Sequence, residues 1–210
     1  MIQQFQRYIY FILCMLSILG LPALATANTP TEQLATLLDH SYMSAKFKQT
    51  VTNGHDHVIS ESQGQLWLKK PDGFKWQVKK PQQQTIVSDG KELMNYDADL
   101  KQAIVKPVPD NVAQTPYLVL LKSQNTQQMN DLFHITSDEK NQFILKPKKE
   151  QGSAIKQVVM TFENDQLHQL IIQSVTGQQT KVQLSDVQFH QISDDTFKFL
   201  VPKGTDIIRQ

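Results

Sequence analysis

Residues 64–78 read "GQLWLKKPDGFKWQV", two runs of alternating apolar and polar side chains around a Pro-Asp-Gly sequence at 71–73. A period of two is typical of strands that bury one face, and Pro-Asp-Gly suits the turn of a tight hairpin. In the second run, Phe74, Trp76 and Val78 therefore share one face of the strand. The stretch predicts a hairpin with one apolar side and one polar side.

The first run obeys the same rule, so Leu66 and Leu68 share one face and Trp67 takes the other. Most of the chain repeats this pattern as short strands separated by turn residues. From Lys46 the apolar positions begin to alternate at Phe47, ahead of an Asn-Gly turn at 53–54. Further strand-like runs cover 84–96, 102–108, 141–147, 155–174, 179–189 and 195–202. Such a series predicts a largely antiparallel sheet.

Residues 29–43, "TPTEQLATLLDHSYM", predict an amphipathic helix. Thr29 suits the N-cap, Pro30 the first helical position, and Glu32 completes a capping box. Apolar side chains then follow at helical spacings of three and four. These side chains are Leu34, Leu37, Leu38 and Tyr42.

Residues 110–133 interrupt the strands in mid-chain. Pro116 suits the start of a helix, and "YLVLLK" at 117–122 is too apolar to lie free in water. We interpret the segment as one or two short helices that fold back on the sheet, with a buried strand or core helix as the open alternative. A curved sheet with so little helix then either encloses an apolar hollow or packs as a filled sandwich. The filled core would contain Phe74, Trp76, Leu93 and Tyr96.

The first residues have the form of a secretory signal peptide. Arg7 precedes a short apolar run, and small residues follow at Ala23, Ala25 and Ala27. The run is too short to span a bilayer of ~30 Å, so we expect cleavage after residue 27 and export to the periplasm. Cys14 lies inside the apolar run, ahead of the cleavage site, so we do not expect it to carry a lipid.

The composition excludes several kinds of site. The chain has 21 Lys plus Arg and 20 Asp plus Glu, and Arg7 leaves with the signal peptide, so the exported protein is nearly neutral and does not attract nucleic acid. Cys14 is the only cysteine and leaves as well, which excludes a disulfide and a thiol nucleophile. Residues 28–210 have the length of a single domain. No glycine-rich phosphate loop stands out, and we expect no cofactor.

Four stretches in order resemble the LolA family of periplasmic lipoprotein carriers. "GQLWLKKPDGFKW" is similar to the family's Gly-Asp-Leu-Trp-Val-Lys-Arg-Pro-x-x-Phe-x-Trp signature, and "IVSDGKELMNYD" resembles its Val-Ser-Asp-Gly-Lys segment. "FKQTVTNG" and "TPYLVLLKS" match in the same order, and the spacing holds to "FLVPKGTDII" near the end. The resemblance covers essentially the whole exported chain.

The resemblance implies an α+β fold, an open antiparallel half-barrel covered by short helices around an apolar cavity. It implies a monomeric carrier, not an enzyme, that takes lipoproteins from the inner-membrane transporter LolCDE and delivers them to the outer-membrane acceptor LolB. The cavity would hold the acyl chains of the cargo. Candidate cavity residues are Phe47, Leu66, Leu68, Phe74, Trp76, Leu93, Tyr117 and Leu118.

Lys70 departs from the family pattern, which has an arginine before the proline. In relatives that arginine hydrogen-bonds a helical lid, so the resemblance makes Lys70 a candidate latch toward carbonyls of the 110–133 insert. Lysine lacks the planar fork of arginine and would hold the lid less rigidly. The alternative is a solvated charge at the end of a hairpin.

Other functions are weaker fits to the sequence. The "HDH" at 55–57 offers two imidazoles without a third ligand nearby, so we predict no metal site. Ser88 lacks the Gly-x-Ser-x-Gly elbow of a serine hydrolase. A different lipid or glycolipid carrier of the same fold, a LolB-like acceptor, a lipid hydrolase acting through Ser88 and an envelope-stress sensor or scaffold are the open alternatives.

Overall fold

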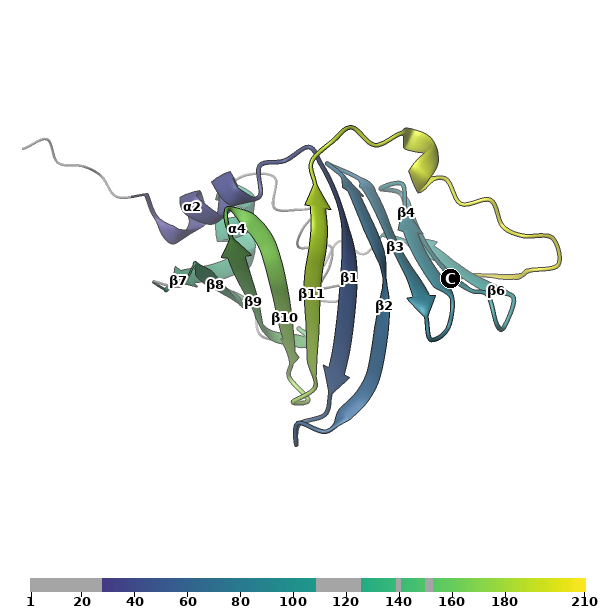
Figure 1. Cartoon of the computed structure of the whole chain (residues 1–210), viewed down its shortest axis with the longest axis horizontal. Coiled ribbons are helices and arrows are strands. Elements are labelled where there is room, and N and C mark those ends of the chain that lie inside the picture. Colours follow the sequence, from purple (N-terminus) through teal and green to yellow (C-terminus); the bar gives the residue numbers. More distant parts are fainter. Residues whose placement is uncertain (1–27, 109–125, 139–140, 150–152) are drawn as a thin grey trace, which may run out of the picture.

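The computed structural model describes residues 28–108, 126–138, 141–149 and 153–210, and the described strands form one curved, open sheet (Figure 1). The twelve strands follow the order β12-β6-β5-β4-β3-β2-β1-β11-β10-β9-β8-β7. The helices are α2 (Pro30–Leu37), α4 (Thr126–Leu132) and the 3₁₀ turn η2 (Asp194–Phe197). The first strands are β1 (Tyr42–Thr52), β2 (Val58–Lys69), β3 (Gly73–Lys80), β4 (Gln84–Ser88), β5 (Glu92–Asp97) and β6 (Gln102–Pro107). The later strands are β7 (Phe133–Ser137), β8 (Gln142–Pro147), β9 (Ile155–Glu163), β10 (Gln166–Ser174), β11 (Gln179–Gln188) and β12 (Asp206–Arg209).

The opening stretch forms the hairpin of β2 and β3, as its alternation predicts. Leu66 pairs with Trp76 and Leu68 with Phe74, and these side chains are buried on the concave face of the sheet. Trp67 pairs with Lys75 on the opposite, convex face. The Lys75 ammonium lies 5.5 Å from the centre of the Trp67 ring, and burial lowers the pKa of Lys75.

Helix α2 begins as the sequence predicts. The Thr29 side chain accepts a hydrogen bond from the Glu32 backbone N–H, and the Glu32 carboxylate accepts one from the Thr29 N–H, which completes the capping box. The helix ends at Leu37, so the prediction that Tyr42 continues its apolar stripe was wrong. Tyr42 begins β1, four residues earlier than expected, and it packs on the convex face.

Two helices form a lid over one half of the sheet (Figure 1). Helix α4 lies within the segment predicted to be helical, and it contacts both α2 and β7. The Thr31 hydroxyl donates to the side-chain carbonyl of Asn130 across 3.0 Å, which joins the two helices. Their buried faces contribute Leu34, Leu38 and Met129 to the core on the concave side.

The C-terminal segment covers the convex face. Ile192 and Phe197 pack there against Val87, with Trp67 and Tyr42 beside them. The prediction of a strand at 195–202 was wrong, because η2 and an extended connection occupy these residues. The final strand is β12 instead, and it pairs in parallel with β6 at the edge of an otherwise antiparallel sheet.

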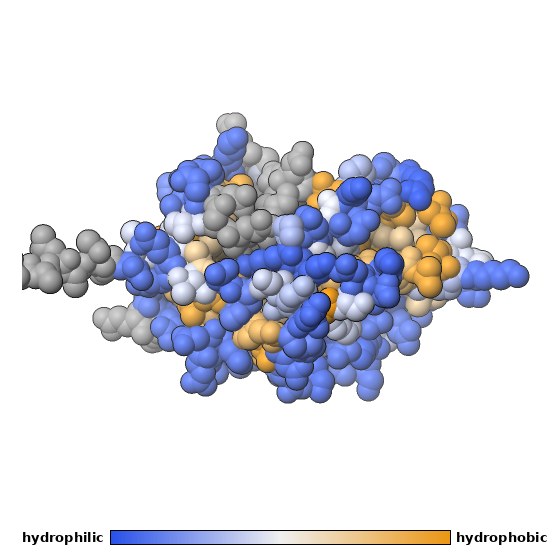
Figure 2. All heavy atoms as spheres, turned by 90° about the horizontal axis from the view of Figure 1, so that it is seen from above, coloured by the Kyte–Doolittle hydropathy of each residue, from blue (hydrophilic) through white to orange (hydrophobic). Residues whose placement is uncertain are grey.

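The surface seen from above is mostly hydrophilic, with hydrophobic atoms gathered at the end of the molecule away from α2 (Figure 2). The most exposed large apolar side chains of the C-terminal segment are Leu200, Ile207 and Ile208. Among the described residues, no helix is both long enough and apolar enough to cross a membrane.

Candidate functional site

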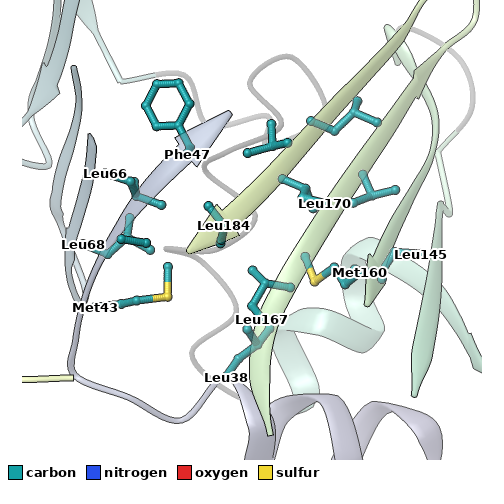
Figure 3. Packing of buried hydrophobic residues seen from close by; sticks show 14 of the residues in the cluster. Leu38, Met43, Phe47, Leu66, Leu68, Leu145, Met160, Leu167, Leu170 and Leu184 are labelled. Carbon is teal, nitrogen blue, oxygen red and sulfur yellow. The ribbon is translucent and has the colours of Figure 1, made fainter. Parts of the chain in front are cut away.

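Two walls of apolar side chains face each other across the concave side of the sheet (Figure 3). Met43 and Phe47 of β1 with Leu66 and Leu68 of β2 form one wall, and Leu167, Leu170 and Leu184 of β10 and β11 form the other. Strand β1 carries a register shift between Ser44 and Lys46 where it meets β11, and such an irregularity bends a strand and increases its twist. The curvature turns the two walls toward each other.

A cavity of about 310 Å³ lies between the walls. None of the described residues that line it carries an ionisable side chain, so the space is apolar with a few amide and hydroxyl groups. The lining consists of Gln49, Val51, Leu66, Trp76, Leu167, Leu170, Ile172, Gln178, Thr180, Val182 and Leu184.

The predicted cavity residues fall into three groups. Leu66 and Trp76 line this cavity, and the Phe47 ring stacks on Trp76 with ring centres 3.8 Å apart. Leu68 and Phe74 are buried in the same apolar cluster without lining the cavity. Phe74 is fully buried, so it does not stand at an open rim in this structure.

The other predicted residues lie away from the cavity or cannot be placed. Leu93 of β5 pairs with Ser88 of β4, and Ser88 pairs with Phe74 of β3, so all three side chains lie on the concave face. Leu93 is buried there but belongs to neither of the two apolar clusters. Tyr117 and Leu118 lie outside the described residues.

Sequence reasoning missed the second wall. Its side chains come from β10 and β11, whose alternation was recognised as strand without being assigned to the cavity. The signal was present as apolar residues at alternate positions of β11 and of the second half of β10, with Leu167 offset by a register shift between Leu167 and Gln169. These residues are Leu167, Leu170, Ile172, Val182 and Leu184.

Lys70 joins the hairpin of β2 and β3 to the end of α2. Its ammonium donates a hydrogen bond to the backbone carbonyl of Leu38, and its backbone N–H donates to the Ser41 carbonyl at 2.9 Å. The sequence predicts carbonyls of the 110–133 insert as acceptors, but residues 110–125 of that insert lie outside the described residues, and the acceptor among the described residues is Leu38, the C-cap of α2. Burial lowers the pKa of Lys70, and the nearby Asp39 carboxylate opposes this shift.

The neighbouring Lys69 points to the opposite face, where its ammonium pairs with the Asp194 carboxylate of η2. That ion pair raises the pKa of Lys69. One pair of lysines therefore holds two covers of the sheet, α2 on the concave side and the C-terminal segment on the convex side.

The residues considered for catalysis have structural contacts. The Ser88 hydroxyl accepts a hydrogen bond from the Gly90 N–H at 3.0 Å and so braces the turn between β4 and β5. The rings of His55 and His57 lie 6.5 Å apart at an exposed hairpin tip. Within the described ranges, no three His, Cys, Asp or Glu side chains gather as metal ligands would.

Comparison with known proteins agrees with this geometry. The model of the family "Outer membrane lipoprotein carrier protein LolA" matches residues 39–200. The chain belongs to the LolA family. The matched region runs from the end of α2 through both walls of the cavity to the C-terminal segment.

Curated LolA relatives match over most of their length. An outer-membrane lipoprotein carrier protein of Francisella tularensis subsp. tularensis (strain WY96-3418) is 39% identical over 184 residues, which cover 87% of this chain and 88% of the relative. The protein of the same name from Chromohalobacter salexigens is 35% identical over 199 residues, 91% of this chain and 93% of the relative.

The chain also shares its fold with a distant solved structure. An uncharacterized conserved protein from Thermus thermophilus superposes with a TM-score of 0.53 at 10% identity, covering 86% of this chain and 97% of that one. At this identity the likeness concerns the fold alone.

Proposed function

We propose that this protein is a periplasmic carrier that shields the acyl chains of lipoproteins between the inner and outer membranes. The observation that carries the proposal is the apolar cavity of about 310 Å³ between the two walls, in a chain of the LolA family. None of the described residues that line this cavity is ionisable. The carrier role follows the name of the curated relatives, and the cavity supplies a physical means for it.

The physical need for such a carrier is large. Each methylene that leaves an apolar environment for water costs about 0.8 kcal/mol, and an acyl chain has many of them. A lipoprotein therefore does not cross an aqueous compartment unaided at a useful rate. A cavity with aliphatic walls lowers this cost by replacing the apolar environment of the membrane.

The finer steps of the proposal come from the family. The transporter LolCDE would load the carrier at the inner membrane, and LolB would accept the cargo at the outer membrane. Helix α2 is held at its end by a hydrogen bond from Lys70, and a contact of this kind can break to let a lid open. Opening the lid would widen the space for the chains, and no catalytic step is needed.

Extraction and mass spectrometry of the purified protein would test the proposal. We expect lipoprotein to co-purify with the wild type and to be reduced in Val182→Phe, which fills the cavity. Gln183→Phe adds the same ring to the opposite, exposed face of β11 and should leave loading unchanged. Thermal unfolding of both variants would show that they fold.

The alternatives give different results in this experiment. Free fatty acid released from added lipid would indicate a hydrolase, and a glycolipid in place of lipoprotein would indicate another carrier of the same fold. A protein that holds no lipid in either form would indicate a scaffold or sensor module.

A further inference from the structure

The turns of the β1–β2 and β10–β11 hairpins meet at the end of the sheet away from α2 (Figure 1). Their backbones touch, since a Cβ on Gly54 would lie 3.7 Å from the Gly177 carbonyl oxygen. Three aliphatic side chains beside this contact project into solvent, and together they are called the aliphatic tip below. They are Val58, Ile59 and Val175, with exposed fractions of 59%, 58% and 61%.

Neither turn uses these side chains to hold its shape. The side-chain carbonyl of Asn53 accepts hydrogen bonds from two backbone N–H groups of its own turn, at 2.9 and 3.0 Å. In the second turn, the Ser174 hydroxyl accepts one from the Gln178 N–H at 3.1 Å. Ile59 is the extra residue of a bulge where β2 meets β1, and a bulge re-aims the side chain that it carries. Polar contacts thus order the two turns and leave the aliphatic tip available to another surface.

The convex face that adjoins the tip is basic. Strands β1, β2, β3 and β11 together carry seven lysines against two acidic residues, Glu61 and Asp186. The whole chain has nearly equal numbers of basic and acidic residues, so this excess is local. The seven lysines are Lys46, Lys48, Lys69, Lys75, Lys79, Lys80 and Lys181.

Three of these lysines border the aliphatic tip. Lys48 and Lys80 line one shallow groove on the convex face, and Lys181 lies near the start of β11, closer to the turn. Within the described ranges, no carboxylate forms an ion pair with any of the three. The acidic side chains nearby are Glu61 in the groove and Asp56 in the first turn. Positive charge therefore remains in excess around the tip.

This combination favours a lipid bilayer over a soluble acidic partner. Lysines are attracted to any anionic surface, and each lysine close to an anionic leaflet strengthens binding about fivefold. Exposed aliphatic side chains gain in addition from the boundary between head groups and acyl chains. A soluble acidic polymer offers the charge without that boundary, so it would leave the aliphatic tip in water.

We infer that the aliphatic tip and its three bordering lysines form a peripheral docking edge for anionic bilayers. The aliphatic side chains enter the head-group layer, and the ammonium groups contact lipid phosphates. None of these six side chains lines the apolar cavity, so the docking edge is a second site beyond the proposed carrier function. The contact is weak and reversible, because it has neither a spanning helix nor a covalent lipid.

Sedimentation with sucrose-loaded vesicles tests the docking edge. The probes are vesicles of phosphatidylglycerol and phosphatidylethanolamine in equal parts, and vesicles of phosphatidylcholine alone. We expect binding to the anionic vesicles to be about tenfold tighter at low salt. Most of this preference should disappear at about 1 M salt, where charges are screened within about 3 Å. Equal binding to both vesicles, or binding to soluble poly-glutamate but to neither vesicle, would overturn the inference.

Paired variants separate the contribution of charge. Lys48→Gln with Lys80→Gln should weaken binding to the anionic vesicles more than tenfold. Lys91→Gln with Lys106→Gln is the matched control, because it removes two exposed lysines near the opposite end of the strands. The control should stay within about twofold of wild type. Equal losses in the two double variants would mean that total charge, and not this edge, drives binding.

A dye on the tip tests the aliphatic contribution. Cys14→Ser removes the only cysteine of the chain, so an introduced cysteine can be labelled alone. An environment-sensitive dye on Val175→Cys should shift its emission to the blue on anionic vesicles. The same dye on Leu200→Cys should not, although Leu200 is 90% exposed. An unshifted dye at Val175, or equal shifts at both positions, would show that the tip does not enter the bilayer and would overturn the inference.

A last variant separates docking from uptake of lipid into the cavity. Val182→Phe fills the cavity, so it should reduce lipoprotein loading and leave sedimentation with anionic vesicles at the wild-type level. Loss of vesicle binding in this variant would assign the binding to the cavity and overturn the docking edge. Vesicle binding by a protein that never carries lipoprotein would contradict the proposed carrier function and leave the docking edge standing.

Discussion

Lys70 donates a hydrogen bond from its ammonium group to the backbone carbonyl of Leu38, the residue that caps the C-terminus of α2. A helix end presents carbonyls without intrahelical partners and a partial negative charge, so a cation there stabilises the helix. The His40 ring, two residues further on, stacks on Phe189 with ring centres 3.7 Å apart. The exit of α2 is thus held by the residues that directly follow β2 and β11.

Replacing Lys70 by leucine should loosen the lid. Lys70→Leu removes the donor and keeps the apolar stem of the side chain, so we expect an apolar dye to enter the empty cavity more readily. We also expect slower transfer of bound lipoprotein to LolB, because closing over an empty cavity then helps less to drive release. Lys70→Arg should tighten closure through its planar fork.

Lys69→Leu is the matched control for this prediction. It removes a neighbouring cation that pairs with Asp194 on the convex face, and it leaves the contact with α2 in place. Dye uptake and transfer should therefore stay near wild type in the control. If all variants take up dye and transfer cargo equally, Lys70 is a solvated hairpin charge and the lid is controlled elsewhere.

Phe74→Glu should abolish loading and lower stability. Phe74 has 0% exposure and lies inside the apolar cluster, so the substitution affects folding as well as the cavity. We expect a loss of about 3 kcal/mol or more in the free energy of unfolding, from lost packing and a buried carboxylate. Urea unfolding measures this loss, with Phe74→Leu as a milder control. A stable variant that loads normally would remove Phe74 from the site.

Gly64→Ala should be among the most disruptive small substitutions in the sheet. A Cβ at Gly64 would lie 1.8 Å from the Gln77 carbonyl oxygen and 2.8 Å from the Phe47 ring. Backbone must move to make room, which we expect to cost about 3 kcal/mol. Gly204→Ala meets no atom within 4 Å and should cost only about 1 kcal/mol from its positive φ. Equal stabilities of the two variants in urea would contradict this account.

The capping box of α2 should weaken in acid. Hydrogen bonds from the backbone and side chain of Thr29 lower the pKa of Glu32 below its ordinary value of 4.5. A lowered pKa in the folded state adds stability above the ordinary value and loses it as the pH falls through the folded value. The melting temperature of the wild type should exceed that of Glu32→Gln at neutral pH, and the difference should shrink below pH 4.5. A difference that is constant with pH would show that the Glu32 charge does not stabilise α2.

Local patterns predicted the elements that depend on neighbours in sequence. The Asn-Gly sequence at 53–54 lies in the turn between β1 and β2, and the β2–β3 hairpin forms around residues 71–73. The capping box was predicted for a similar reason, because Thr29 and Glu32 contact each other within one helical turn. The prediction for residues 195–202 was wrong because Phe197 and Phe199 pack on another part of the sheet, and their alternation does not reflect strand pairing.

The sequence by itself determined the hairpins, the start of α2, the face that each β2 and β3 side chain takes and, through its resemblance, the family. Only the tertiary structure decided that β10 and β11 supply the second wall, that Phe74 is closed off from solvent, and that Lys70 reaches Leu38. The physical reason is distance along the chain. A turn or a cap is fixed by residues a few positions apart, whereas the curvature of the sheet brings Leu66 and Leu184 to one cavity from strands far apart in sequence.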